Sequence, residues 1–377
     1  MTSRPPAARR RVSDRLPDFP WDTIAAAKAA AAAHPDGIVD LSVGTPVDPV
    51  DPLIRDALAS EAAFPGYPTT IGTPELREAA ASALIRRYGI DGVDEASILP
   101  VIGTKEAIAG LASTLGLGSG DTVVIPEVAY PTYEVSALLA GAAAVRADST
   151  VQLGPSAPAL LFLNSPSNPT GRVLGVEHLR KVVEWARERG TIVVSDECYL
   201  GLSWDTDAVS ILDPRVSGGD HTGLLAVHSL SKISNLASYR AGFLAGDRSL
   251  IAELLAVRKH AGLMVPYPIQ VAMTAALSDD VHVDAQRERY RARRDILLAA
   301  VNAAGFRVDD SEAGLYLWAT RGEGARETVD WLAARGILAA PGDFYGPAGA
   351  EHVRMALTAT DERIAAAAER LASAAIS

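Results

Sequence analysis

Residues 224–232 read LLAVHSLSK, an apolar run that ends in two serines and a lysine. Such a run has no polar alternation, which is typical of a strand buried on both faces of a sheet. Lys232 follows the strand directly, where desolvation lowers the pKa of an amine until it can form a Schiff base with a carbonyl group. Ser229, Ser231 and the later Arg240 are suited to a phosphate. The stretch therefore indicates a phosphorylated aldehyde, pyridoxal phosphate (PLP), held at Lys232.

A surface turn with an ordinary lysine would account for these four residues equally well, so the rest of the chain has to decide. The 377 residues are enough for one large domain and a smaller one. A net charge of -11 argues against a general nucleic-acid binder. No apolar run reaches the roughly 18–20 residues of a membrane span. The one cysteine, Cys198, excludes an internal disulfide, and the histidines show no metal-ligand spacing. We expect a cytoplasmic protein with no nucleic-acid, membrane or metal partner.

Short apolar runs alternate with helical patterns from residue 98 onward. The expected strands span residues 99–102, 122–125, 159–163, 191–194, 224–228 and 242–245. Buried strands separated by helices predict a mostly parallel sheet that is covered on both faces. After a long helix at 281–304, strands and helices follow in mixed order and predict a smaller α+β domain. The expected divisions are a disordered arm (1–15), an N-terminal segment packing on the small domain (16–45), a large coenzyme-binding domain (46–280) and the small domain (281–377).

Polar side chains follow several of these strands, where ligands bind in open α/β sheets. Thr104 and Lys105 start a helix after Gly103, so their backbone N–H groups form an anion site. The other candidates at strand ends are Tyr130, Asn168, Asp196 and Tyr199. Each alone has an ordinary role as a cap, a turn residue or a core aromatic. Their shared location favours one ligand site.

Three motifs together resemble the class I/II aminotransferases, which are PLP-dependent enzymes of the aspartate aminotransferase superfamily. They are Asn168-Pro169-Thr170-Gly171, Asp196-x-x-Tyr199, and Ser229-x-Ser231-Lys232 with Arg240. The resemblance covers residues 44–354. It implies the α/β architecture of PLP-dependent fold type I: a large domain with a mostly parallel seven-stranded sheet between helices, and a smaller α+β domain. It also implies a homodimer with shared active sites.

The resemblance also implies a role for each candidate residue. Lys232 would bind the coenzyme and move a proton, Asp196 would pair with the ring nitrogen, and Tyr199 would bind the ring oxygen. The remaining coenzyme contacts would be Thr104, Lys105 (through its backbone), Tyr130 (stacked on the ring), Asn168, Ser229, Ser231, Arg240 and, from the partner subunit, the residue equivalent to Tyr67. The substrate would contact Gly44, Asn168 and Arg354, because the planar guanidinium of an arginine matches a carboxylate.

The identity of the substrate rests on two N-terminal stretches, residues 12–22 and 42–48, which resemble N-succinyldiaminopimelate aminotransferases of bacterial lysine synthesis. This implies a ping-pong exchange between N-succinyl-LL-2,6-diaminopimelate and 2-oxoglutarate, with glutamate as the product. Arg15, Lys28 and Arg258 are candidate partners for the succinyl carboxylate. An aspartate or aromatic aminotransferase and a PLP-dependent carbon–sulfur lyase remain alternatives. A PLP-binding transcription regulator is disfavoured by the net charge and by the short segment before Gly44.

Overall fold

A seven-stranded sheet forms the centre of the large part of the chain. The computed structural model describes residues 11–374, and the strand order in this sheet is β2-β8-β7-β6-β5-β3-β4. The strands are β2 (Ile98–Ile102), β3 (Thr122–Ile125), β4 (Ala143–Arg146), β5 (Leu160–Asn164), β6 (Ile192–Asp196), β7 (Leu224–Ser229) and β8 (Ala241–Gly246). Only β8 runs antiparallel to its neighbours. The predicted α/β architecture is confirmed, and the half-exposed edge strand β4 is an addition that the apolar pattern did not show.

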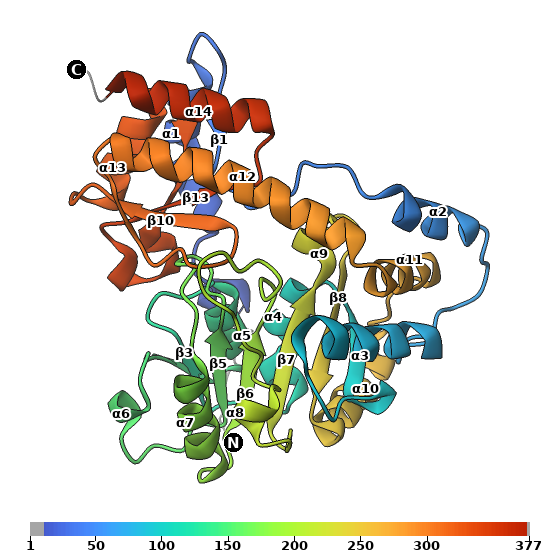
Figure 1. Ribbon diagram of the computed structural model, residues 1–377. Coiled ribbons are helices and arrows are strands. Elements are labelled where there is room, and N and C mark those ends of the chain that lie inside the picture. The colour runs from blue at the N-terminus through green and yellow to red at the C-terminus, as the bar shows by residue number, and fades with distance from the viewer. Residues whose placement is uncertain (1–10, 375–377) are drawn as a thin grey trace, which may run out of the picture.

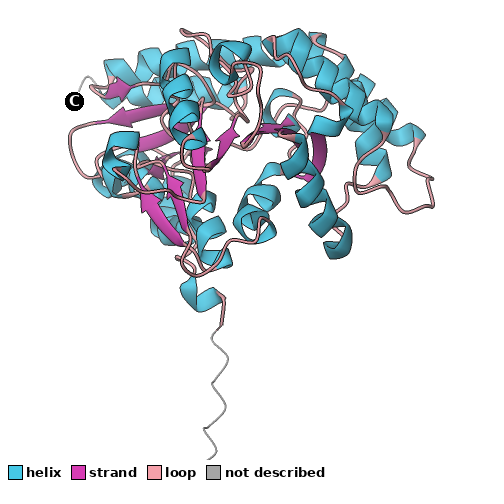
Figure 2. Ribbon diagram, turned by 90° about the horizontal axis from the view of Figure 1, so that it is seen from below, coloured by secondary structure: helices cyan, strands magenta, loops and turns pink. Residues whose placement is uncertain are grey.

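Helices cover both faces of this sheet (Figures 1 and 2). They are α3 (Pro74–Tyr88), α4 (Thr104–Thr114), α5 (Thr132–Ala140), α6 (Thr150–Leu153), α7 (Val176–Arg187), α8 (Pro214–Ser217), α9 (Leu230–Ile233) and α10 (Arg248–Ala261), with α2 (Pro52–Ser60) and α11 (Tyr267–Ser278) packed together at one side. Local sequence fixes their ends. At the start of α3 the Thr73 side chain accepts a hydrogen bond from the Leu76 N–H, and a cap of this kind stabilises a helix by about 1 kcal/mol. Gly89 ends α3 in the left-handed conformation, at φ 65°.

The core of the sheet explains why its strands form where they do. All six residues of β7 and all five of β5 are buried, as expected for strands between two helical layers. Burying each Leu, Val or Phe side chain contributes about 1.5–3 kcal/mol. The sheet is therefore a rigid base, and the loops that leave the carboxyl ends of its strands are held by it.

A second, antiparallel sheet of order β12-β13-β10-β9 forms the small domain. Its strands are β9 (Arg307–Asp309), β10 (Tyr316–Thr320), β12 (Ala340–Pro341) and β13 (Val353–Ala356), and its helices are α12 (Val281–Ala303), α13 (Ala325–Ala333) and α14 (Asp361–Ala374). In Figure 1 the long α12 runs from this domain toward α11 of the large part. Arg293 on α12 pairs with Asp48 at 2.7 Å and with Asp361 at 2.6 Å.

The N-terminal segment joins the small domain. Strand β1 (Val39–Asp40) pairs in parallel with β11 (Ile337–Leu338), and α1 (Ala25–Ala32) packs against α13. Residues 1–10 of the expected arm lie outside the described residues. Ser13–Arg15 and Pro20–Ile24 form short 3₁₀ helices. Among residues 11–374, no helix combines the length and apolar character needed to cross a membrane.

Candidate active site

A cavity of about 710 Å³ brings together almost all the residues that the sequence singled out. It is lined by Gly44, Thr104, Lys105, Tyr130, Asn168, Asp196, Tyr199, Ser229, Ser231, Lys232, Arg240 and Arg354. Tyr67 does not line it, because its side chain is 96% exposed at the surface. The residues come from the exits of β5, β6 and β7 and from β13 of the small domain, so both domains build the site.

Lys232 lies on the short helix α9, immediately after β7. The Ser229 side chain caps this helix by accepting a hydrogen bond from the Ser231 N–H at 3.1 Å. The Lys232 Nζ donates to the Gly44 carbonyl. Burial lowers the pKa of the Lys232 amine, and the nearby Arg354 and Arg240 lower it further. A larger fraction of this amine is neutral, and therefore nucleophilic and basic, than for a lysine in water.

Asp196 is the last residue of β6, and both of its carboxylate oxygens have a donor. Oδ1 accepts from the Cys198 N–H at 3.2 Å, and Oδ2 accepts from the Tyr133 hydroxyl at 2.7 Å. Burial raises the pKa of this carboxyl group. A buried carboxylate is stable when a positive group or a proton faces it, which suits a protonated ring nitrogen. Sequence reasoning missed Tyr133. Its place at the start of the helix that follows β3, three residues after Tyr130, was the available signal.

An anion site lies beside Lys232. Helix α4 begins at Thr104 and follows Gly103, whose φ is +75°. A Cβ at residue 103 would collide with the Arg240 guanidinium, so only glycine lets the arginine approach the helix start. The first N–H groups of the helix, the hydroxyls of Ser229 and Ser231, and this guanidinium are the donors that phosphate requires.

Arg354, on β13 of the small domain, also lines the cavity. Nη1 donates to the Asn168 Oδ1 at 2.8 Å and Nη2 to the Ser42 carbonyl at 2.6 Å. The guanidinium lies over the Tyr316 ring, 4.0 Å from its centroid. Its Nε is buried and has no hydrogen-bond partner within residues 11–374. An unsatisfied buried donor on a cation costs free energy that an incoming carboxylate recovers.

Three tyrosines line the remaining walls. The hydroxyls of Tyr199 and Tyr316 lie 3.0 Å apart, and burial raises the pKa of Tyr199 well above its usual value. Burial raises the pKa of Tyr130 to about 12, so both phenols stay protonated and can donate. A Cβ at Gly44 would strike the Tyr316 hydroxyl. Sequence reasoning missed Tyr316, since a predicted strand does not say which of its faces meets the site.

The rim of the cavity differs from expectation in its cations. Lys105 lines the cavity, and its Nζ lies 5.5 Å from the centroid of the Phe19 ring. Arg15, Lys28 and Arg258 do not line the cavity. Arg258 is buried and pairs with Glu106 at 3.1 Å, so it is not free to bind a ligand. Trp21 completes the rim beside Phe19, with 5.8 Å between ring centroids.

The donor set matches PLP group by group. The start of α4 together with Arg240 suits the phosphate of PLP. Asp196 suits the ring nitrogen of PLP, and Lys232 suits its aldehyde. The fold and the site together define a PLP-dependent aminotransferase. The chain belongs to the aminotransferase class I and II family, whose sequence model matches residues 36–371.

Similar proteins agree with this assignment. A probable aminotransferase of Mycobacterium tuberculosis is 70% identical over 97% of this chain and 87% of that protein. The Streptomyces rimosus enzyme OxyQ, a 4-dedimethylamino-4-oxo-anhydrotetracycline transaminase, is 58% identical over 94% of this chain and 99% of its own. A solved structure described as a probable N-succinyldiaminopimelate aminotransferase, from Thermus thermophilus, superposes with a TM-score of 0.85 at 28% identity, covering 94% of this chain and 100% of that chain.

Proposed function

We propose that the protein transfers the amino group of N-succinyl-LL-2,6-diaminopimelate to 2-oxoglutarate, forming glutamate, in a ping-pong reaction. The observation that carries the proposal is that the cavity is lined by two cations, Arg354 and Lys105, in addition to Lys232 and Arg240, which are assigned to the coenzyme. The proposed donor carries distal carboxylates as well as the α-carboxylate at its reacting end, so a second cation beside the one that holds the α-carboxylate suits it. The likeness to the Thermus thermophilus structure supports this substrate class.

The site residues have separate tasks in this reaction. When bound, PLP supplies an electron sink that stabilises negative charge on the substrate α-carbon. Lys232 Nζ, with its lowered pKa, would take the proton from that carbon and deliver it to the former aldehyde carbon of the coenzyme, so that the amino nitrogen stays with the coenzyme and the substrate leaves as a 2-oxo acid. Arg354 holds the α-carboxylate, and Asn168 keeps the guanidinium in place. Asp196 provides the fixed negative charge opposite the coenzyme ring.

The active unit in this proposal is a homodimer. Tyr67 lies in the segment between α2 and α3, and its side chain is 96% exposed. Leu53 and Phe64 nearby in sequence are 51% and 40% exposed. Exposed large apolar and aromatic side chains are suited to a protein interface, from which Tyr67 would reach the coenzyme phosphate of the other subunit.

A second candidate substrate is a ketone on a polycyclic ring system. It is favoured by the 58% identity to OxyQ and by the rings of Phe19 and Trp21 at the rim, which offer a flat apolar surface. Lys105 would then face an acidic group of the ring system, so the two candidates use the same rim differently.

A panel of amino donors separates these candidates. Succinyldiaminopimelate, aspartate and phenylalanine are each assayed with 2-oxoglutarate as acceptor, and glutamate is assayed with a polycyclic ketone. The proposal expects the highest kcat/KM for succinyldiaminopimelate, and a Lys105→Gln variant with KM raised about tenfold for that donor but not for phenylalanine. Lys28→Gln is the matched control. An equal change of KM for both donors in Lys105→Gln contradicts the proposal, and release of ammonia and pyruvate without consumption of 2-oxoglutarate indicates a lyase.

A further inference from the structure

A second cavity, of about 300 Å³, shares no lining residue with the first. Its walls come from the exits of β3, β4 and β5, from α7, and from the β9–β10 turn and His352 of the small domain. The loop at residues 164–171 contributes Asn164, Ser167 and Thr170 to this cavity and Asn168 to the active site. The two cavities are therefore neighbours that are separated by one loop.

Arg172, Asp148 and Asp310 line the cavity with charged side chains that are exposed to solvent. The side chains of Arg172, Asp310 and His178 make no hydrogen bond or ion pair with any residue in the range 11–374. Asp148 accepts only a backbone N–H, that of Glu127 at 2.9 Å. Asp309 differs, because it is satisfied by Arg307 at 2.8 Å and by His352 at 2.8 Å. One guanidinium and two carboxylates remain for a ligand.

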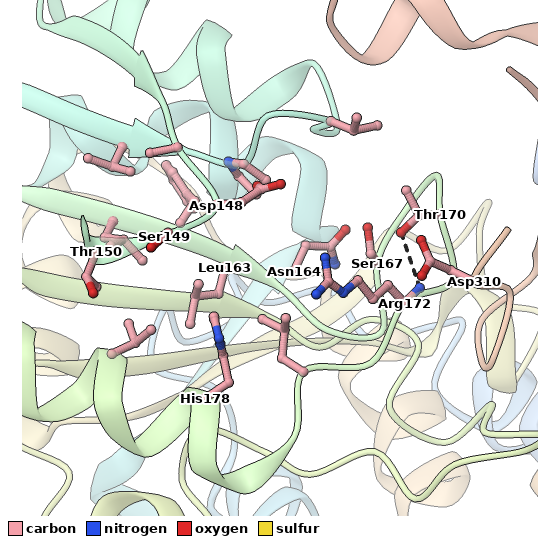
Figure 3. A pocket seen from close by; sticks show the side chains of 18 of the residues that line it. Asp148, Ser149, Thr150, Leu163, Asn164, Ser167, Thr170, Arg172, His178 and Asp310 are labelled. Carbon is pink, nitrogen blue, oxygen red and sulfur yellow. Dashed lines mark hydrogen bonds between the residues drawn. The ribbon is translucent and has the colours of Figure 1, made fainter. Parts of the chain in front are cut away.

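These groups lie within electrostatic reach of one another. Arg172 acts on the pKa of both His178 and Asp310, and Asp148 acts on that of His178. Figure 3 shows the Arg172 side chain running along the cavity toward Asn164, with Asp310 at one end beside Thr170 and Asp148 toward the other. The positive group thus stands between two negative ones along the cavity.

Part of the cavity lining, called its floor below, is apolar. This part includes Leu163, Leu174, Val182, Val128 and Trp318. Charged ends above an apolar floor match a ligand with a methylene chain between charged groups. A bare cation fits less well, because the Arg172 guanidinium would repel it.

The geometry points to this cavity as a second binding site, for a free basic α-amino acid of the lysine or ornithine type. Its carboxylate would bind Arg172, its two ammonium groups would bind Asp148 and Asp310, and its methylenes would cover the leucines of the floor. A ligand with one negative and two positive groups is the charge complement of the Arg172 guanidinium and the Asp148 and Asp310 carboxylates. The site is distinct from the catalytic cavity and does not depend on which amino donor the enzyme uses.

Isothermal titration of the PLP-loaded enzyme with L-lysine and L-ornithine tests the site. We expect saturable binding that weakens at least tenfold in Arg172→Gln and in Asp310→Asn, since each removes one charge-assisted contact. Arg180→Gln, a change to a partly exposed arginine of α7 that pairs with Glu177 and does not line the cavity, is the matched control and should leave binding unchanged.

Two further titrations distinguish this cavity from the catalytic one and test recognition of the carboxylate. Binding should persist in Arg354→Gln, because Arg354 lines the catalytic cavity and not the second one, and its loss there would place the ligand in the active site and overturn the proposal. Equal affinity for 1,5-diaminopentane would show that the carboxylate is not recognised, and would also overturn it. So would absence of binding to the native enzyme, or equal affinity in the native enzyme and Arg172→Gln. Weaker binding of L-alanine than of L-lysine is the result expected from two ammonium contacts.

Discussion

The hydroxyl of Tyr133 donates a 2.7 Å hydrogen bond to Oδ2 of Asp196. Tyr133 is fully buried, and its ring stacks on Phe162 with 5.0 Å between centroids. Packing therefore fixes the position of the hydroxyl, and the hydroxyl fixes the carboxylate. Because this bond favours the ionised form of Asp196 while burial disfavours it, Tyr133 helps to keep a negative charge at the base of the coenzyme cavity.

Tyr133→Phe should reduce kcat/KM by roughly 10- to 100-fold, which corresponds to the loss of one hydrogen bond to a charged group. Without the bond, the pKa of Asp196 rises further, so the acid limb of the pH–rate profile should move to higher pH. The measurement is kcat/KM from pH 5 to 9 in both proteins. Tyr239→Phe, outside the cavity, is the control. A reduced rate with an unmoved acid limb would mean that Tyr133 acts only through packing.

Arg354→Lys should raise KM about 100-fold for every amino donor and for 2-oxoglutarate. The lysine keeps the charge but loses the planar guanidinium, which is held between Asn168 and Ser42 in the native protein. Steady-state kinetics with two donors of different side chain provide the measurement. Loss of activity toward only one donor would be incompatible with a contact to the α-carboxylate, which all donors share.

Gly103→Ala should weaken PLP binding by tenfold or more. An alanine would have to adopt φ +75° and its Cβ would push Arg240 away from the start of α4, and both effects cost free energy. Titration of the apoenzyme with PLP, followed by its visible absorbance, measures the change. Gly116→Ala has a comparable φ of +74° with open space around the Cβ, so it controls for backbone strain alone. Equal coenzyme affinity in the two variants would remove the steric argument.

Much of this arrangement could be predicted from the sequence, because it depends on runs of neighbouring residues. The apolar runs that became β5, β6 and β7 could pair only inside a covered sheet, so the residues that follow them, Asp196 and Lys232 among them, had to meet at one edge. Strands of two residues such as β1 and β11 carry no such pattern, since each exists only by pairing with a segment remote in sequence.

The contacts between side chains on different elements were beyond the sequence. Tyr316 meets Tyr199 because β10 of the small domain approaches the loop after β6, which no local periodicity encodes. The roles of the cations near the rim could not be predicted for the same reason. The sequence does not show that Arg258 pairs with Glu106, and the position of Lys105 next to Phe19 depends on how the N-terminal segment folds back.

Behind the coenzyme cavity, Glu197 and His228 form a buried pair, with 3.5 Å between Oε2 and Nε2. The rings of Tyr88 and Phe243 stack on the imidazole, at 6.2 Å and 5.1 Å between centroids. Burial raises the pKa of Glu197 to about 7 and lowers that of His228 to about 3. Between these values the pair holds one proton, which is also what the two separate side chains hold in the unfolded chain between their ordinary pKa values of 4.5 and 6.5.

Glu197→Gln should therefore change how stability depends on pH. In the native protein, the raised pKa of Glu197 makes its contribution to stability grow as the pH falls from 7 to 4.5, because the folded state binds more protons there. The lowered pKa of His228 has the opposite effect, because below pH 6.5 the unfolded state binds more protons at this residue and its contribution to stability falls. Between pH 6.5 and 4.5 the changes in the contributions of Glu197 and His228 therefore nearly cancel. The glutamine removes the first contribution and leaves the second. Relative to the native protein, the variant should lose on the order of 2 kcal/mol of unfolding free energy as the pH falls from about 7 to about 4.5. Denaturant unfolding at about pH 7, 6, 5 and 4.5 measures this difference, and a difference that stays constant over the range would show that the pair does not exchange its proton as described.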